Sequence, residues 1–350
     1  MVSLGKGGLE RSCANLSFLL DNCDYDVHLV TLNDDVDYDY KGELFNLGKY
    51  KSDDDNLFKR LLRFKRLKRY FKAQSFDYIL DNRVGNQAWR ELYYRLYIYG
   101  LRSRVVYVQH SSRLQNHFPD KSLITSLLVK YANSFVGVSK GITEKFNTVY
   151  STNKCHTIYN YKQEIKRVSE AYSYPERYII YLGRLDEQTK NLSLLLEAYQ
   201  LSTLPSKRVK LIIMGDGPDK GFLESKIIEL SLDRDVILKP FTPHIFHALS
   251  QAVFAVLTSQ YEGFPMTLVE SLSCGTPLVA VDCDSGPREI IQHEENGLLV
   301  ENHNSHALAL AMNRMIEDEI LYSRCKKNAK NSIKHLQMEV LAKAWQALLK

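Results

Sequence analysis

Short apolar runs alternate with longer helical patterns along the whole chain, and this alternation limits the fold more than any other feature of the sequence. Runs rich in Val, Ile, Leu and Tyr predict strands at 27–32, 76–80, 104–109, 134–138, 155–159, 178–183, 209–214, 236–239, 253–258 and 277–281. Helical patterns separate them, notably at 189–202, 218–231, 266–274 and 305–317. Such an alternation predicts parallel sheets that are covered by helices on both faces.

A chain of 350 residues is long enough for two domains, each with its own core. The segment 161–176 is polar and lacks an apolar strand pattern, so we place the domain boundary there. We predict an α/β protein with two Rossmann-like, doubly wound domains that face each other across a cleft, over 1–165 and 175–335. Ligands of such sheets bind outside the carboxyl ends of the strands, so candidate site residues are sought in those loops.

Composition and cysteine spacing exclude several classes of protein. The six cysteines are scattered, without a CxxC pair or a metal-like His/Cys spacing, which favours free thiols in a reducing cytoplasm. No apolar run approaches the ~18 residues of a membrane span. The net charge of +5 permits an anionic partner but does not select one. We therefore expect a soluble, cytoplasmic protein without disulfides.

The most informative stretch is "TSQYEGFPMTLVESLSCGTPLVA", in which a strand, a turn and a helix follow one another. Pro265 is expected at the first helical position, where its missing N–H needs no partner. Gly263 and Phe264 form the turn before it, and the amides of Met266 and Thr267 become donors at the positive end of the helix dipole. Such a helix start predicts a site for a phosphate or a diphosphate.

Two glutamates flank this turn, Glu262 before it and Glu270 within the helix. A carboxylate beside a bound diphosphate would be repelled unless it served another group, and sugar hydroxyls are suitable hydrogen-bond donors for it. This interpretation assigns Glu270 to a nucleotide ribose and Glu262 to a transferred sugar. The alternative, in which Glu270 only favours a helix N-terminus, has similar support from the spacing alone.

Cationic and imidazole side chains follow other predicted strands. Arg184 lies just past a strand end and Lys190 at the start of the next helix, where fixed cations would stabilise a leaving diphosphate. His110 ends the run "RVVYVQH" and can donate to a sugar hydroxyl or a phosphate, although a structural role is commoner for a lone histidine. Gly215 also follows a strand, and it either approaches the nucleotide or only forms a turn.

A glycine loop lies at the start of the sequence. Gly5, Gly7 and Gly8 precede a predicted helix and would let the backbone approach an acceptor or a donor phosphate, and a tight turn explains them equally well. Only three residues precede the loop, whereas about five or six are usual for a strand. We expect that the natural start lies upstream, which would leave a slot in the sheet, or that the central strand is abbreviated.

Together these stretches resemble glycosyltransferase family 4, whose members are retaining enzymes of the GT-B fold that use nucleotide sugars. The most specific element is the Glu-x7-Glu spacing from Glu262 to Glu270. Further matches follow in order along nearly the whole chain: "GKGGLER", "VVYVQH", "GVSKGITEKF", "IYNY", "GRL" with Lys190-Asn191, "GDGP", "DSGPREII" and "NGLLV". The stretch "SGPREII" also resembles members that act on UDP-sugars in bacterial surface-polysaccharide pathways.

The resemblance implies a role for each matching residue. Arg184 and Lys190 would hold the donor diphosphate in place of a metal, so that neither a metal nor another cofactor is expected. Glu262 would contact the donor sugar, Glu270 the ribose, and the amides after Gly263 the phosphates.

The resemblance also implies that His110 reaches the donor sugar from the first, acceptor-side domain. The reaction would retain the anomeric configuration by attack on the same face, with the leaving phosphate taking the acceptor proton. The last helix, at 336–350, would cross back to the first domain.

The segment 57–72 carries eight basic residues and no acidic one. Leu57, Leu61, Phe64 and Phe71 fall on one arc of the predicted helix, which favours a helix packed on its sheet with a solvated basic face. The alternative is a cationic face on anionic lipid. Because acceptors in the similar pathways are often lipid-linked, the expected partners are a nucleotide-sugar donor, a glycan or polyprenyl-linked glycan acceptor, and the inner face of the cytoplasmic membrane.

Other function classes have weaker support. A metal-dependent transferase would use an Asp-x-Asp motif, and Asp35 and Asp37 have that spacing but lie in an acidic loop. A nicotinamide enzyme would need GxGxxG, and the opening loop lacks the third glycine. A sugar-nucleotide epimerase of the same architecture stays as an alternative. A non-enzymatic nucleic-acid or anion binder is the other, although no recognition module supports it and no nucleic-acid partner is expected.

Overall fold

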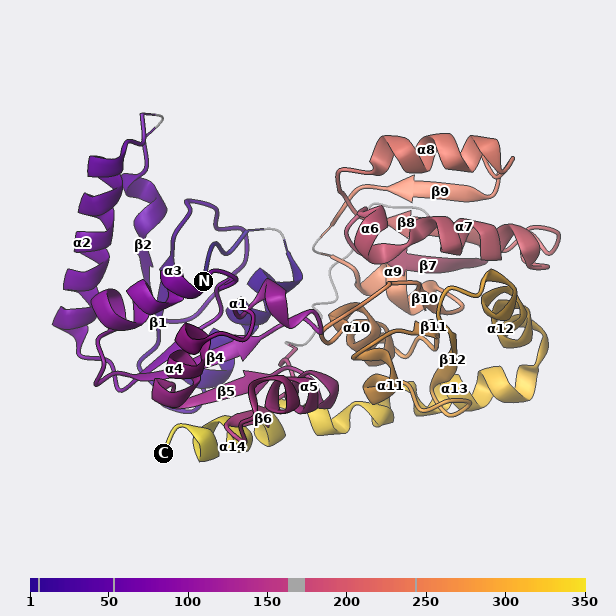
Figure 1. Cartoon of the computed structure of the whole chain (residues 1–350). Coiled ribbons are helices and arrows are strands. Elements are labelled where there is room, and N and C mark those ends of the chain that lie inside the picture. The colour runs from indigo at the N-terminus through magenta and orange to yellow at the C-terminus, as the bar shows by residue number, and fades with distance from the viewer. Residues whose placement is uncertain (6, 53, 163–173, 243) are drawn as a thin grey trace. The chain divides into compact units, whose positions relative to one another are not determined.

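The computed structural model describes residues 1–350 apart from 6, 53, 163–173 and 243, and the chain forms two compact units (Figure 1). Unit 1 comprises Met1–Tyr161 together with Leu336–Lys350, and unit 2 comprises Lys162–His335. Most of the segment in which the sequence places the boundary lies outside the described residues. Every pairing between the described strands is parallel, which confirms the predicted type of sheet.

Unit 2 is built around a six-stranded sheet in the order β12-β11-β10-β7-β8-β9. Its strands are β7 (Tyr178–Leu182), β8 (Lys210–Met214), β9 (Val236–Lys239), β10 (Ala255–Leu257), β11 (Leu278–Asp282) and β12 (Gly297–Glu301). The first of them in sequence, β7, lies in the middle of the sheet between β8 and β10. All five residues of β7 are buried, as expected for a strand that helices cover on both faces.

The helices of unit 2 lie in the connections between these strands and, for the last two, after β12. They are α6 (Glu187–Lys190), α7 (Leu192–Leu201), α8 (Lys220–Glu229), α9 (Phe246–Gln251), α10 (Met266–Cys274), α11 (Pro287–Ile290), α12 (Ser305–Glu317) and α13 (Glu319–Ser332). The helix predicted over 189–202 is in fact two helices, because Asn191 adopts a left-handed conformation with φ of 50°. Asparagine tolerates this conformation better than most residues, since its short polar side chain can bond locally.

Unit 1 holds its strands in two separate sheets. β1 (His28–Thr31) pairs with β2 (Glu43–Asn46), and β3 (Tyr78–Asp81), β4 (Arg104–Gln109), β5 (Ser134–Gly137) and β6 (Cys155–Thr157) form the second sheet in that order. The segment before the glycine loop forms no regular strand, and only Leu4 makes an isolated parallel bridge, to Val36. The two sheets therefore end at β1 and β3, with no described strand pairing one with the other.

Two strands, β2 and β12, were not predicted from the sequence. β2 contains only four residues and lies in an acidic stretch, and β12 begins with a glycine and is only partly buried. Both lie at the edge of a sheet, where one side of the strand has no neighbour to select for apolar, β-branched residues.

The longer helices of unit 1 are α1 (Gly8–Asp21), α2 (Leu57–Gln74), α3 (Ala88–Tyr93), α4 (Leu123–Tyr131), α5 (Lys140–Tyr150) and α14 (Met338–Leu348). Shorter turns are η1 (Leu47–Tyr50), η2 (Tyr94–Tyr99), η3 (Leu114–Asn116) and, after α13, η4 (Lys334–Leu336). α14 packs against α1 with Trp345 buried, and the Tyr78 hydroxyl donates to the Lys350 carbonyl at 2.6 Å. The C-terminal helix thus completes unit 1 (Figure 1).

The packing predicted for α2 is partly wrong. Phe64 and Phe71 contact the core, but Leu57 and Leu61 are 77% and 60% exposed, and the one fully buried residue of the helix is Leu67. The apolar side chains in the first turns of α2 therefore face solvent. No helix among the described residues is long and apolar enough to span a membrane.

Candidate functional site

The loops that follow β7 and β10 bring two predicted site residues together. The Lys190 ammonium donates to Glu262 Oε1 at 2.6 Å, and the Ser259 hydroxyl donates to the same oxygen at 2.7 Å. These residues are far apart in sequence, but β7 and β10 are neighbours, so their carboxyl ends meet at one edge of the sheet. Arg184 also follows β7 and is exposed.

Backbone contacts fix the position of Lys190. The Asp186 carboxylate caps α6 by accepting from the Thr189 amide at 3.0 Å. The Thr258 hydroxyl then donates to the Lys190 carbonyl at 2.9 Å, and the Gln260 amide donates to the Thr189 carbonyl at 2.9 Å. The end of α6 is therefore joined to the loop after β10, and the lysine side chain is held beside Glu262.

The Lys190–Glu262 pair is partly buried, with exposed side-chain fractions of 20% and 12%. Among the described residues both hydrogen bonds to Glu262 reach Oε1, which leaves Oε2 able to accept from a ligand hydroxyl. The ammonium carries three donors, so it can bond an anion without releasing the glutamate. Burial, with Glu262 close by, raises the pKa of the Cys283 thiol to about 12, so this cysteine is not a nucleophile here.

The turn before α10 differs from the sequence prediction in one detail. Pro265 occupies the N-cap position, and the helix begins at Met266, because the backbone of Pro265 is extended, with ψ of 98°. Among the residues that the structure describes, no side chain caps this helix, so the amides of Met266 and Thr267 in its first turn can donate to an anion. The placement of Met266 and Thr267 at the helix start agrees with the predicted phosphate site, whose occupant stays a prediction.

A second loop holds this turn in place. The Ser285 hydroxyl donates to the Gly263 carbonyl at 3.2 Å. Gly286 has φ of 94°, and a Cβ there would lie 2.4 Å from Pro265 Cδ, so only glycine fits. Phe264 is buried under the turn. The loop of "DSGPREII" thus packs against the turn before α10, so Ser285 and Gly286 in this motif have a structural role.

Glu270 lies on α10 and is only 1% exposed. A carboxylate at this depth requires hydrogen-bond donors around it, whereas a residue that only favoured the helix dipole would lie in the first turn and face solvent. The burial of Glu270 therefore disfavours the interpretation that this residue only favours the N-terminus of the helix. The contact with a ribose stays a prediction.

Gly215 has a structural role that the sequence analysis left open. A Cβ on it would lie 1.8 Å from the Gly183 carbonyl oxygen, so the loops after β7 and β8 approach each other too closely for a side chain. Its contact with a nucleotide stays a prediction.

In unit 1, His110 follows β4 and its Nε2 lies 2.8 Å from Asn82 Oδ1, at the end of the neighbouring strand β3. Because the amide oxygen can only accept, Nε2 carries the proton and Nδ1 is the acceptor. Burial lowers the pKa of His110 to about 3, and the nearby His117 adds to the shift. Burial likewise lowers the pKa of His117 to about 4. Both imidazoles are therefore neutral at physiological pH.

A buried ion cluster that was not predicted from the sequence lies beside this histidine. Arg83 donates to Asp81 and to Glu91, each at 2.7 Å, and the Tyr99 hydroxyl donates to Asp81 at 3.0 Å. The Arg83 guanidinium lies 3.4 Å from the Tyr94 ring centroid. Its charge holds the pKa of Asp81 below the usual range despite burial. The signal was available, because "DNR" directly follows a predicted strand.

Carboxylates surround the opening glycine loop. Gly7 is the N-cap of α1 and Gly8 its first residue. A Cβ on Gly5 would lie 2.0 Å from Asp35 Oδ2, and one on Gly7 would lie 2.1 Å from Glu10 Oε2. The negative charges of these two carboxylates disfavour binding of an anion at the loop in this conformation. Phosphate binding there stays a prediction. Within the described part of the chain, no group of three His, Cys, Asp or Glu residues could hold a metal ion.

Comparison with known proteins identifies the family. Residues 162–332 match the family model described as glycosyl transferases group 1. Over 354 aligned residues, covering 95% of the chain and 93% of the relative, the chain is 31% identical to a Campylobacter jejuni enzyme. That relative is N-acetylgalactosamine-N,N'-diacetylbacillosaminyl-diphospho-undecaprenol 4-alpha-N-acetylgalactosaminyltransferase. The chain belongs to the group 1 glycosyltransferase family.

Other similar proteins agree with this assignment. The amylovoran biosynthesis glycosyltransferase AmsD of Erwinia amylovora is 25% identical over 98% of the chain and 96% of its own length. A TarM variant from Staphylococcus aureus has a TM-score of 0.78 at 16% identity, over 100% of this chain and 98% of that one. HepE from Anabaena, solved with UDP-glucose, has a TM-score of 0.75 at 19% identity over 100% and 97%.

These comparisons confirm the GT-B fold and a sugar-transferring enzyme. The epimerase and the nucleic-acid binder are set aside, because family membership rests on a full-length relative that is a glycosyltransferase.

The buried histidines predict how stability depends on pH. Both take up protons near pH 6.5 in the unfolded chain but only near pH 3 to 4 when folded. Between these values the unfolded state binds more protons, so stability is full above pH 6.5 and falls as the pH is lowered. Each histidine contributes up to about 1.4 kcal/mol per pH unit. The combined variant His110→Asn, His117→Gln should therefore lose less stability than the wild type between about pH 7 and 5.

Thermal unfolding at each pH measures this difference. His156→Gln serves as a control, since His156 is an exposed residue of β6 in the same unit. An acid dependence that is the same in all three proteins would contradict the neutral, buried state of the two imidazoles.

Proposed function

We propose that the chain transfers a sugar from a UDP-sugar to a polyprenyl-linked glycan, with retention of configuration, in the synthesis of a bacterial surface polysaccharide. The observation that carries the proposal is the Lys190–Glu262 pair beside the uncapped start of α10. Support for the donor comes from the neighbour that was solved with UDP-glucose. Support for the acceptor comes from the Campylobacter relative, whose name specifies a diphospho-undecaprenol substrate.

In this proposal the donor diphosphate bonds the amides of Met266 and Thr267 and the cations Arg184 and Lys190. Negative charge develops on the diphosphate as the bond from the sugar C1 to its oxygen breaks, and fixed cations and amides stabilise that charge. The acceptor hydroxyl attacks C1 on the same face. Its proton passes to the leaving phosphate oxygen, so no separate base is needed. Glu262 holds a hydroxyl of the sugar through Oε2.

The proposal assigns the role of a metal to these cations and to the helix dipole. A lysine and an arginine bring two positive charges to the diphosphate, and the first amides of α10 add the positive end of a helix. We therefore propose transfer without a metal or another cofactor.

His110 is proposed to contact the donor sugar from unit 1. The Nε2–H of His110 donates to Asn82 Oδ1, so Nδ1 would accept a hydrogen bond from a sugar hydroxyl. Because the imidazole is neutral, it can do this without placing a second cation beside the breaking bond.

We propose that α2 rests on the inner face of the cytoplasmic membrane, where a polyprenyl-linked acceptor is anchored. Leu57, Phe58, Leu61 and Leu62 of this helix are all exposed, and basic residues surround them. An exposed apolar cluster within a basic surface fits the interface of an anionic bilayer better than it fits water. Trp89 of α3, also exposed, is suited to the same interface.

Removal of the ammonium at position 190 tests the donor site. Lys190→Ala should lower kcat/KM for the UDP-sugar by about a hundredfold or more, as loss of one preorganised donor to a developing oxyanion does. Glu262→Gln should lower it too. The double variant should lose less than the sum of the single losses, because the two side chains share one hydrogen bond.

Lys207→Ala is the matched control. Lys207 forms a similar pair with Glu317 at 2.5 Å, but both side chains are well exposed on the surface of unit 2. Its activity should equal that of the wild type, and each assay should give the same rate with EDTA. Wild-type activity of Lys190→Ala would contradict the proposed donor site, and loss of activity with EDTA would contradict transfer without a metal.

The membrane contact is tested with vesicles of phosphatidylcholine and phosphatidylglycerol in equal parts. Replacement of Arg60, Lys65 and Arg69 by Gln should weaken binding by at least about thirtyfold, since each basic residue near an anionic surface contributes about 1 kcal/mol. Phe58→Ala should weaken it further through loss of buried apolar area.

A control variant removes the same charge elsewhere. Lys326, Lys327 and Lys330 are exposed on α13 of unit 2, and their replacement by Gln should leave binding unchanged. Equal loss in both triple variants would mean that net charge, and not α2, governs the binding.

A further inference from the structure

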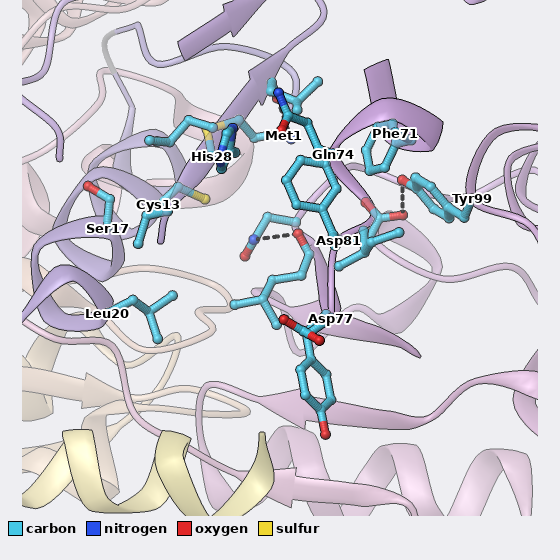
Figure 2. A pocket seen from close by; sticks show the side chains of 18 of the residues that line it. Met1, Cys13, Ser17, Leu20, His28, Phe71, Gln74, Asp77, Asp81 and Tyr99 are labelled. Atoms are coloured by element: carbon cyan, nitrogen blue, oxygen red, sulfur yellow. Dashed lines mark hydrogen bonds between the residues drawn. The ribbon is translucent and has the colours of Figure 1, made fainter. Parts of the chain in front are cut away.

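A buried turn of unit 1, Asp81-Asn82-Arg83, lies at the carboxyl end of β3 and contains two opposite charges. Asp81 Oδ1 accepts from the Arg83 backbone amide and from Arg83 Nε, each at 3.0 Å. Asp81 Oδ2 accepts from the Arg83 guanidinium at 2.7 Å and from the Tyr99 hydroxyl at 3.0 Å (Figure 2). One carboxylate thus closes the turn and pairs with the guanidinium, so the backbone on both sides of Asn82 is fixed.

This buried ion pair is weak evidence for added stability. The removal of two charges from water costs about as much free energy as their pairing returns, and apolar residues of similar size often serve a fold equally well. The pair does select one conformation, because its two partners are separated by a single residue. That residue, Asn82, is itself buried, with 4% of its surface exposed. What the ion pair holds in place is therefore the position of Asn82.

The Asn82 side chain bonds in two directions. Its Nδ2 donates to the Leu80 carbonyl at 3.3 Å, and its Oδ1 lies 2.8 Å from Nε2 of His110, at the end of β4. The bond to Leu80 determines which end of the amide faces the imidazole. An amide oxygen accepts a hydrogen bond without carrying a charge. Nε2 of His110 therefore holds the proton, and Nδ1 of the neutral ring is an acceptor.

The other groups around His110 do not favour a charge on its ring. The ring centroid of His117 lies 5.7 Å away, and this histidine lowers the pKa of His110 further. The ion cluster of Arg83 contains both signs of charge, which offset each other at the imidazole. Among the described residues, the polar and aromatic side chains that border the small pocket shared with His110 include no carboxylate; they are Ser12, Asn82, Tyr159, Asn160, Tyr161 and Trp345.

We propose that Asn82 is a positioning residue for sugar transfer, which holds His110 as the Nε2–H tautomer and so presents Nδ1 to the transferred sugar as a hydrogen-bond acceptor. The buried pair of Asp81 and Arg83 fixes Asn82 for this task. The inference rests on the contact between His110 and the donor sugar proposed above. A neutral acceptor can bond a hydroxyl, which brings a proton, but not an ionised phosphate oxygen, which also accepts.

The identity of the residue at position 82 is central to this proposal. An aspartate has nearly the same shape as asparagine, but its negative charge would stabilise the imidazolium. Both nitrogens of an imidazolium are donors, so Nδ1 could no longer accept from a sugar hydroxyl. An alanine would leave Nε2 without this acceptor and the ring without its orientation.

These two substitutions separate positioning from a merely structural role. Asn82→Ala should lower kcat/KM for the UDP-sugar by about tenfold at every pH, since one hydrogen bond that orients the ring is lost. Asn82→Asp should match the wild type near pH 8, where the carboxylate still accepts from Nε2. Its activity relative to the wild type should fall at least about twofold towards pH 5, because the pKa of His110 rises and the imidazolium forms.

NMR of the chain with isotope-labelled histidine measures the state of His110 without any substrate. The signal of His110 is assigned by its loss in His110→Asn. The wild type should show the Nε2–H tautomer down to about pH 4, because burial keeps the pKa of His110 near 3. Asn82→Asp should take up the proton on His110 at a proton concentration at least about a hundredfold lower.

Asn86→Ala and Asn86→Asp are the matched controls. Asn86 is exposed in the same loop before α3, and its Oδ1 accepts from Arg90 at 3.3 Å, which a carboxylate can also do. Both controls should match the wild type in activity, in its pH dependence and in the titration of His110. The same acid loss in Asn86→Asp would overturn the proposal, since any added charge in the loop would then suffice.

Three further results would overturn it. The first is a wild-type His110 that is the Nδ1–H tautomer or an imidazolium at pH 7, and the second is an unchanged pKa of His110 in Asn82→Asp. The third is an equal loss of activity in Asn82→Ala and Asn82→Asp at every pH. A wild-type chain that transfers no sugar from UDP-sugars would instead contradict the proposed function, and the NMR titration would still support or overturn the hydrogen bond from His110 to Asn82.

Discussion

Parallel pairing of the strands is the constraint on which the rest of this structure depends. All strands of a parallel sheet end at the same edge, so loops that are distant in sequence meet there. Lys190 and Glu262 form their hydrogen bond because β7 and β10 are neighbours in the sheet of unit 2. In unit 1, His110 and Asn82 meet for the same reason at the ends of β4 and β3. Each candidate residue thus lies where the topology places it.

Burial then determines which of these groups carry charge. Lys190 keeps its partner Glu262 in a partly exposed loop, where a charged pair is stable and an incoming diphosphate can share the ammonium. His110 of unit 1 is neutral, because burial lowers its pKa to about 3, so its imidazole can accept a hydrogen bond from a hydroxyl. In unit 2 the carboxyl edge of the sheet thus presents a charged pair, whereas in unit 1 a neutral imidazole lies beside the ion cluster of Arg83.

The buried strands and the candidate residues in the loops after them could be predicted from the sequence, because both depend on local patterns of residues. β7 and β4 are buried on both faces and appear as continuous apolar runs, so they were found, whereas the edge strands β2 and β12 lack that pattern. Lys190 and Glu262 were predicted from the loops in which they lie. The hydrogen bond between them depends on the order of strands in the sheet, which local sequence patterns do not show. The ion cluster of Arg83 was missed because "DNR" contains only Asp81, and the second partner, Glu91, lies on α3.

We propose that the donor diphosphate binds at the start of α10 with Lys190 as its cation. A crystal structure of the chain with UDP would show whether it does. We expect diphosphate oxygens within about 3.2 Å of the Met266 and Thr267 amides and of the Lys190 ammonium. A diphosphate bound at the glycine loop before α1, or one held away from α10 by a metal ion, would contradict it.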